Sequence, residues 1–279
     1  MIPKYFFTPS LGREICLEVY EENKEDEYVI IVHGTMTDPS CFKGLIREFL
    51  KVRINAVIVH LVGHGKSPGL NRPFCFNDMK QNIKDAITWS IGRYNKRPHL
   101  TGTSQGGFLV AAVAAEEGRI KSVYPHGIML PKLNESIMVT RYPVSLAGVT
   151  WLIRKTLDIS SRVLPNMSIP YRWYIDPKRI GSGRMVAIMD DIKKYPLWHV
   201  SSLFNADMSG LEKGLKCPVG VIELEGETLF PSRYIEMVYG RLNAPMKRIF
   251  RIDSKTHSAF LEEPKKIVDA IEPMIRECA

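Results

Sequence analysis

The sequence contains one serine whose neighbours suit it to nucleophilic chemistry, Ser104 in the pentapeptide G-T-S-Q-G at 102–106. A short strand-like run at 97–101 precedes it, and an alanine-rich apolar run at 108–115 follows it. Glycines two residues to either side let the chain turn sharply from strand to helix without side-chain collisions. A serine presented on such a turn can attack an acyl carbon when a base removes its proton. The pattern therefore predicts that Ser104 is a nucleophile.

This strand, turn and helix resemble the nucleophile turn of the α/β-hydrolase superfamily, whose members carry an acid and a histidine after the serine, in that order. Residues 247–252 have the composition of a strand, and the loop that follows them contains His257. This part of the chain is similar to the last strand and the histidine loop of the family. The resemblance implies that His257, among seven histidines, is the base.

The sequence departs from the family pattern at the acid. Members usually carry an aspartate after the seventh strand, but the corresponding segment 218–231 contains none. Its two prolines align with those of the family without a gap, which puts Glu227 at the aspartate position. Glu225 is the alternative acid, and Glu135 is a third candidate if neither serves. A glutamate can fix the tautomer of the histidine and stabilise the imidazolium, as an aspartate does.

The resemblance also implies an oxyanion hole. The apolar run at 27–32 ends in His33-Gly34-Thr35, and in the family the residue after this His-Gly pair donates a backbone N–H to the developing oxyanion. The residue after the nucleophile supplies the second donor. Carried onto this chain, the two donors are the N–H groups of Thr35 and Gln105. Two fixed donors of this kind contribute several kcal/mol to transition-state stabilisation in serine hydrolases.

Two further histidines lie in segment 55–67, which resembles a strand of the family and its D-x-x-G-x-G-x-S turn, with His60 in place of the aspartate. We interpret His60 and His64 as structural residues of this turn. A metal site is not favoured, because no nearby carboxylate or cysteine in the sequence completes a ligand set.

The elements that must position these residues follow from the hydrophobic pattern. An N-terminal hairpin is expected near residues 5–20, and buried strands are expected at 28–32, 55–61, 97–101, 120–130, 218–224 and 247–252. Helices lie between them, as in segment 76–91, where an Asn77 or Asp78 cap precedes apolar residues at helical spacing. Alternation of apolar strands and helices predicts an α/β fold with a mostly parallel sheet covered on both faces.

One long stretch interrupts the alternation. From 131 to 215 the strands stop, and helix-like pieces are separated by prolines. We expect a helical cap insertion at 131–215, on an α/β-hydrolase core formed by 1–130 and 216–279. Aromatic residues of the cap could line an acyl or aryl pocket or form the core of the cap, among them Trp151, Trp173, Tyr174 and Trp198.

Charge and composition limit the partners. With 38 basic and 30 acidic residues the net charge is +8, and 12 basic against 7 acidic residues give the cap +5, which favours anionic surfaces or substrates. No nucleic-acid motif accompanies this charge, so nucleic acid is not an expected partner. Segment 144–153 could contact a lipid surface but is too short to span a membrane.

The N-terminus has no signal-peptide pattern, and the five scattered cysteines favour free thiols, so we expect a cytoplasmic protein.

Together these features predict a cofactor-free serine hydrolase that acts on small-molecule carboxylic esters with a hydrophobic acyl or aryl group. The chain is most similar to small esterases, lysophospholipases and monoacylglycerol lipases. An acyltransferase, thioesterase, lactonase or C–C hydrolase could use the same three residues. A ligand-binding protein on an inactive hydrolase scaffold is the alternative of another class. The oligomeric state is left open by the sequence.

Overall fold

A central eight-stranded sheet organises the computed structural model, which describes every residue except 1, 36, 131–146, 171–174 and 181–193. Strand β2 is antiparallel to both of its neighbours, and all pairs from β4 to β10 are parallel. In spatial order the strands are β1 (Lys4–Ser10), β2 (Arg13–Tyr20), β4 (Ile54–Val59), β3 (Glu27–Val32), β5 (His99–Thr103), β6 (Ser122–His126), β9 (Val219–Leu224) and β10 (Lys247–Ile252).

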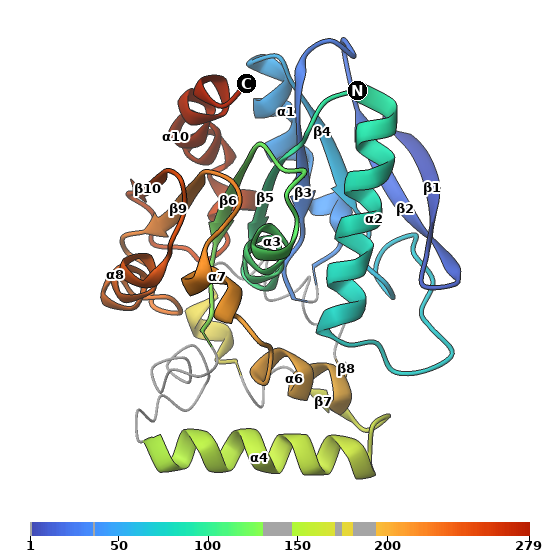
Figure 1. Cartoon of the computed structure of the whole chain (residues 1–279), viewed down its shortest axis with the longest axis vertical. Coiled ribbons are helices and arrows are strands. Elements are labelled where there is room, and N and C mark those ends of the chain that lie inside the picture. The colour runs from blue at the N-terminus through green and yellow to red at the C-terminus, as the bar shows by residue number, and fades with distance from the viewer. Residues whose placement is uncertain (1, 36, 131–146, 171–174, 181–193) are drawn as a thin grey trace.

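Helices cover both faces of the sheet (Figure 1). One face packs against α2 (Phe76–Tyr94), α3 (Gln105–Glu116) and α8 (Ser232–Arg241), and the other packs against α1 (Lys43–Lys51), α9 (Ala259–Glu262) and α10 (Pro264–Glu277). Successive strand residues point to opposite faces of the sheet. On β3, Ile30 packs in the hydrophobic core on the side of α2, α3 and α8, and Ile31 packs in the core on the side of α1, α9 and α10. Because both faces are buried, the central strands β3 and β4 are almost entirely apolar instead of alternating with polar residues.

The predicted α/β-hydrolase architecture is confirmed. The N-terminal hairpin is β1–β2, and all six expected strands are present, with ends that differ by at most four residues. Strand β10 coincides with the expected 247–252, but it is an edge strand whose residues are mostly exposed or half-buried, so the expectation that it is buried is wrong. The expected capping of α2 is wrong, because Cys75 is the N-cap residue and Asp78 lies at the third helical position. The Asp78 carboxylate accepts a 2.8 Å hydrogen bond from the Cys75 N–H and pairs with Arg72, so Asp78 reaches back to the helix end from inside the first turn.

The described part of the cap stretch contains helices and one small sheet. The helices are α4 (Ala147–Val163), α6 (Leu197–Phe204) and α7 (Ser209–Lys213), and a 3₁₀ turn, η4, covers Pro177–Arg179. The expectation that strands stop here is wrong, because β7 (Ser168–Pro170) pairs antiparallel with β8 (Lys194–Pro196). A three-residue strand is too short to show a periodic pattern in the sequence.

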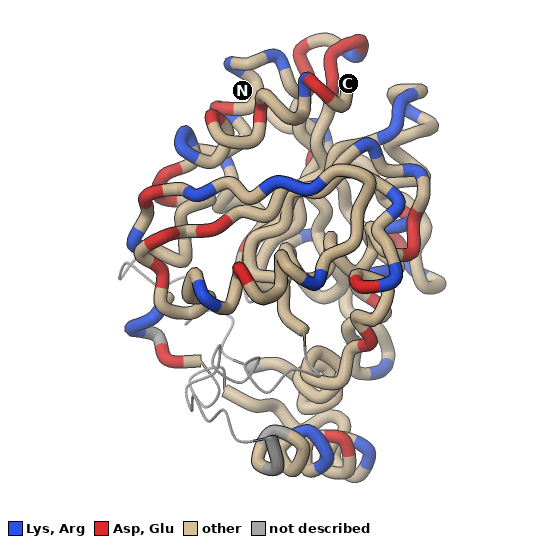
Figure 2. Tube along the Cα trace, turned by 60° about the vertical axis from the view of Figure 1, so that its left-hand side comes forward, with Lys and Arg blue, Asp and Glu red and all other residues tan. Residues whose placement is uncertain are grey.

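Helix α4 lies at the edge of the molecule, across the bottom of Figure 1, with α6 between it and the sheet. Its outer face exposes apolar residues: Trp151, Ile159 and Val163 are 60%, 62% and 71% exposed. Basic and acidic residues are interspersed over most of the chain, α4 included (Figure 2). No helix among the described residues has the length and apolar character needed to cross a membrane.

Candidate active site

Ser104 occupies a strained turn between β5 and α3. Its backbone angles are φ 55° and ψ −124°, in a region that residues with a Cβ atom rarely adopt. The flanking glycines make this turn possible, because a Cβ atom on Gly102 would lie 2.5 Å from the carbonyl oxygen of Gly106. A Cβ atom on Gly106 would lie 2.2 Å from the carbonyl oxygen of Val32. Strain of this kind costs on the order of 1–3 kcal/mol and is concentrated at functional sites.

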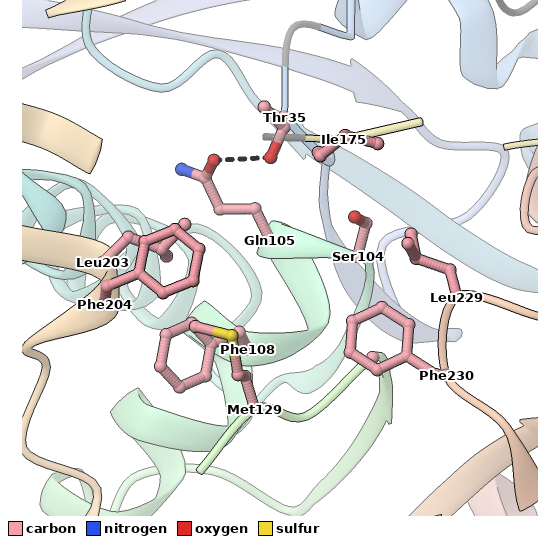
Figure 3. Close-up of a pocket in the computed structure, with 11 residues that line it drawn as sticks. Thr35, Ser104, Gln105, Phe108, Met129, Ile175, Leu203, Phe204, Leu229 and Phe230 are labelled. Carbon is pink, nitrogen blue, oxygen red and sulfur yellow. Dashed lines mark hydrogen bonds between the residues drawn. The ribbon is translucent and has the colours of Figure 1, made fainter. Parts of the chain in front are cut away.

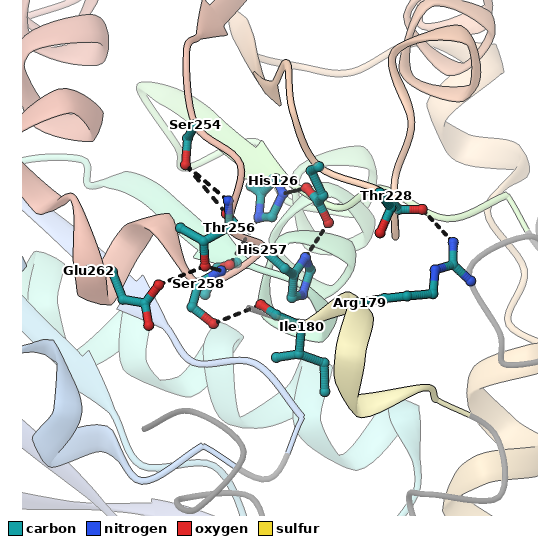
Figure 4. A network of polar contacts seen from close by, with 11 residues as sticks. His126, Arg179, Ile180, Thr228, Ser254, Thr256, His257, Ser258 and Glu262 are labelled. Carbon is teal, nitrogen blue, oxygen red and sulfur yellow. Dashed lines mark hydrogen bonds and ion pairs between the residues drawn. The ribbon is translucent and has the colours of Figure 1, made fainter. Parts of the chain in front are cut away.

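His257 and Glu227 form a buried pair. His257 lies in the loop after β10, and its Nδ1 atom hydrogen-bonds to Oε1 of Glu227, which follows β9 (Figure 4). Only 1% of the Glu227 side chain is exposed. Of the alternative acids, Glu225 is exposed to solvent, and Glu135 lies outside the described residues.

The surroundings of Glu227 keep it ionised. Burial alone would raise its pKa, but electrostatic attraction and hydrogen bonding from His257 and His126 outweigh burial and lower the pKa to about 2. An ionised carboxylate only accepts hydrogen bonds, so Nδ1 of His257 must be the donor of this pair. The Nε2 atom of His257 is then left as an acceptor, which is the tautomer that a general base needs.

Ser104 and His257 line one pocket, together with Gly34 and Thr35 from the loop after β3. The hydrogen bond of the His257 ring runs to Glu227, and the ring does not bond to Ser104. In unliganded enzymes the bond between nucleophile and base often forms only in the substrate complex, so the arrangement is compatible with a serine–histidine pair.

The two expected oxyanion donors also lie beside Ser104 (Figure 3). Gln105 is the first residue of α3, so its backbone N–H has no acceptor within the helix. The Thr35 hydroxyl donates a 2.8 Å hydrogen bond to Oε1 of Gln105, which ties the loop after β3 to the start of α3. The structure therefore brings Thr35, Gln105 and Ser104 together at one end of the pocket.

The rest of the pocket wall is apolar. Both the core and the cap contribute to it, through Phe108, Met129, Ile175, Leu203, Phe204, Leu229 and Phe230. The aromatic residues that the sequence suggested for this role do not line it in the described chain: Trp151 is on the outer face of α4, and Trp198 is half-buried elsewhere in the cap. Trp173 and Tyr174 lie outside the described residues.

Sequence reasoning missed one member of the polar network, His126 at the end of β6. Its Nε2 atom lies 2.7 Å from Oε2 of Glu227, and its Nδ1 atom lies 2.9 Å from Oγ1 of Thr103. The side chain is fully buried, and burial lowers its pKa although the charge of Glu227 acts in the opposite direction. The sequence offered one signal for it: a histidine at the end of the strand that follows the serine segment. This histidine belongs to no known motif, so the signal is weak.

The side chains of His126, Glu227 and His257 are also close enough to hold a metal ion, since their ligand atoms lie within 4.8 Å of one another. Two histidines and a carboxylate are common zinc ligands. Here the ring nitrogens that face Glu227 both hydrogen-bond to it, one to each oxygen. A metal ion at this point would have to break both bonds.

Neither His60 nor His64 lines the pockets that contain Ser104, and both make contacts with neighbouring elements. The Nε2 atom of His60 lies 3.0 Å from Oε2 of Glu18, and its Nδ1 atom accepts a 3.0 Å hydrogen bond from the N–H of Lys66. The Nε2 atom of His64 lies 2.5 Å from the hydroxyl oxygen of Tyr195 in β8. These bonds connect the β4 loop to β2 and to the cap.

The chain belongs to the alpha/beta hydrolase family, whose sequence model matches residues 29–270. Its fold is similar to that of a monoacylglycerol lipase from Paleococcus ferrophilus, with a TM-score of 0.74 and 19% identity over 95% of this chain and 100% of the other.

Two other solved structures share the fold. A thermophilic esterase from Thermogutta terrifontis has a TM-score of 0.65 and 17% identity over 100% of this chain and 99% of the other. A haloalkane dehalogenase loop variant from Bradyrhizobium elkanii has a TM-score of 0.65 and 14% identity over 99% of this chain and 97% of the other. A comparison with curated proteins gives no match.

Proposed function

We propose that the protein is a serine hydrolase that cleaves carboxylic esters with a hydrophobic acyl or aryl group through an acyl-enzyme intermediate. One observation carries the proposal: Ser104 lies on a strained turn in the pocket that also contains the imidazole of His257, itself bonded to the buried carboxylate of Glu227. Family membership and the similarity of the fold to a monoacylglycerol lipase and an esterase agree with it.

The chemistry begins with attack of the Ser104 Oγ atom on the acyl carbon, while Nε2 of His257 takes the hydroxyl proton. The electron pair of the carbonyl moves to its oxygen, where the N–H groups of Thr35 and Gln105 donate to it. Loss of one such donor costs about 10²–10³ in kcat in known enzymes. Glu227 stabilises the imidazolium, which then gives its proton to the leaving alcohol. Water repeats the sequence on the acyl-enzyme and releases the carboxylic acid and free Ser104.

The preference for a hydrophobic group follows from the pocket wall. The residues around Ser104 are almost all apolar, and Leu203 and Phe204 extend this wall into the cap. Each acyl methylene that such a wall removes from water contributes about 0.8 kcal/mol. A panel of esters, thioesters and lactones of increasing acyl length, with Ser104→Ala as the blank, tests the substrate class. Rates that peak at acetyl and fall with each added carbon would contradict it.

We also propose a transient contact between α4 and an anionic lipid surface. The outer face of the helix presents Trp151, Ile159 and Val163 to solvent, and at 100° per residue Lys155 and Arg162 lie on the same face. Both basic side chains are exposed. Helices that lie in a membrane interface combine apolar residues, which enter the acyl boundary, with basic residues that attract anionic lipids. On α4, Arg162 also pairs with Asp158 at 3.1 Å.

Co-sedimentation with phosphatidylglycerol vesicles at low salt tests this contact. The wild-type protein should sediment with the vesicles, and the double variant Ile159→Ser, Val163→Ser should not. Phe7→Ser is the matched control, because Phe7 is also half exposed but lies on β1. Equal sedimentation of wild type and double variant would contradict the proposal. So would a concentration-dependent dimer that the double variant loses, since a second copy would then cover this face.

A further inference from the structure

The carboxylate of Glu227 is bonded on both of its oxygens, to His257 through Oε1 and to His126 through Oε2. We propose that His126 is a positioning residue, which holds the second oxygen of Glu227 so that the first stays directed at His257. This inference rests on the proposed function, because it assigns His126 to the same three-residue site.

The hydrogen bonds define one arrangement of protons. Glu227 is an acceptor, so Nε2 of His126 carries the proton that it donates over 2.7 Å. The Nδ1 atom of a neutral His126 is then an acceptor, and the Thr103 hydroxyl, 2.9 Å away, donates to it. The chain of bonds therefore runs from Thr103, next to the nucleophile, through His126 and Glu227 to His257.

The backbone around His126 leaves it little freedom to move. A Cβ atom on Gly107 of α3 would lie 1.8 Å from the carbonyl oxygen of His126, so helix and strand are in close contact at this residue. Phe230 and Phe260 flank the imidazole, with ring centroids 6.0 and 5.9 Å away. A rigid second anchor suits a glutamate in particular, because its side chain has one more torsion to fix than that of an aspartate.

Burial also separates the roles of the two histidines. The His126 side chain is fully buried, whereas His257 lines the pocket where a substrate would bind. The charged or titratable groups that act on His126 in the described chain are Glu227 and His257. Arg179 of η4, whose guanidinium bonds to the carbonyl of Thr228, acts on Glu227. A neutral His126 lets the single negative charge of Glu227 face one developing cation, the imidazolium of His257.

The kinetic test compares His126→Phe with His126→Gln, because the glutamine amide can donate where Nε2 of the histidine does. His126→Phe should lower kcat about 10- to 100-fold, the loss typical of a removed supporting partner, with KM within about twofold. It should also move the acid limb of kcat/KM to higher pH, since a carboxylate with one hydrogen-bond donor fewer is more basic and stabilises the imidazolium of His257 more strongly. His126→Gln should restore most of kcat and the wild-type limb. Equal effects of the two variants, or none, would overturn the proposal.

A measurement on the unmodified protein avoids the risk that His126→Phe does not fold. Nitrogen-15 NMR of the histidine rings, assigned with His126→Gln, should show His126 neutral and protonated at Nε2 at pH 7, with titration only below the ordinary histidine pKa. Protonation at Nδ1, or titration near the ordinary histidine pKa of about 6.5, would overturn the inference. The result does not depend on turnover, so a protein with the expected spectrum that hydrolyses no ester would refute the proposed function alone.

Discussion

The hydroxyl of Thr35 donates a 2.8 Å hydrogen bond to the side-chain carbonyl of Gln105, and this bond joins the two segments that carry the expected oxyanion donors. Neither backbone N–H is changed by a substitution in the Thr35 side chain. Thr35→Val should therefore lower kcat about fivefold with little change in KM, because one neutral hydrogen bond contributes about 1 kcal/mol. Thr35→Ser retains the hydroxyl and is the control. If steady-state kinetics give the same kcat for Thr35→Val and Thr35→Ser, this hydrogen bond does not contribute to catalysis.

The strain at Ser104 predicts an effect on stability that is independent of activity. Ser104→Gly removes the Cβ atom from a residue with φ 55°, whereas Ser104→Ala retains it. Relief of about 1–3 kcal/mol of strain exceeds the roughly 0.5–1 kcal/mol that a glycine loses through chain entropy. In urea unfolding the Gly variant should be more stable than the Ala variant by on the order of 1 kcal/mol. An Ala variant that is the more stable of the two would argue against a strained turn.

The pocket wall predicts how chain-length preference depends on the cap. Phe204→Ala should lower kcat/KM for long acyl esters more than for acetyl esters, because the ring removed lies against the pocket beside Ser104. In the wild type each added methylene is expected to raise kcat/KM by up to about fourfold, and this increase should be smaller in Phe204→Ala. Trp151→Ala is the matched control: this side chain is 60% exposed on α4, so the profile for soluble esters should not change. Equal chain-length profiles of kcat/KM for Phe204→Ala and wild type would show that Phe204 does not contact the acyl group.

His199 predicts part of the pH dependence of stability. Its ring is fully buried in α6 against Phe74 and Tyr195, and among the described residues neither ring nitrogen has a hydrogen-bond partner. Burial lowers its pKa to about 3, whereas the unfolded chain has an ordinary histidine pKa of about 6.5. Between these values only the unfolded state binds the proton, so the free energy of unfolding decreases as the pH falls.

This loss has an upper limit of about 1.4 kcal/mol per pH unit for one histidine. His199→Leu removes the titrating group and two unpaired polar atoms, so it should be as stable as the wild type at pH 7 or more stable. Between pH 6.5 and 4.5 its stability should decline less steeply. Urea unfolding at several pH values measures both slopes, and identical slopes would show that His199 does not titrate in this way.

Much of the fold could be predicted because its signals are local. The strands and the α2 and α3 helices follow from apolar runs, and the turn at Ser104 from its two glycines. The capping of α2 differs from the expectation because the preference of asparagine and aspartate for the N-cap is only a tendency, and here Asp78 bonds to the helix end from the third helical position. The short pair β7–β8 has too few residues for any pattern.

The candidate site likewise contains residues that the sequence predicts and residues that it does not. Ser104, His257 and Glu227 belong to motifs with fixed places along the chain, and the structure brings all three to the same region. His126 and the pocket residues Leu203 and Phe204 do not belong to any motif. Their places depend on which strand lies beside β5 and on how α6 packs against α2 and α4, and these are tertiary contacts that residue types alone do not reveal.

The central claim is that Ser104 is an activated nucleophile, and labelling with a fluorophosphonate followed by peptide mass spectrometry tests it most directly. We expect one adduct per chain, on Ser104, and none in Ser104→Ala. Glu227→Gln should slow labelling by orders of magnitude through loss of the correct His257 tautomer, while Glu225→Gln, at an exposed residue, should label at nearly the wild-type rate. A folded wild-type protein that does not react, or an adduct that persists in Ser104→Ala, would contradict the account.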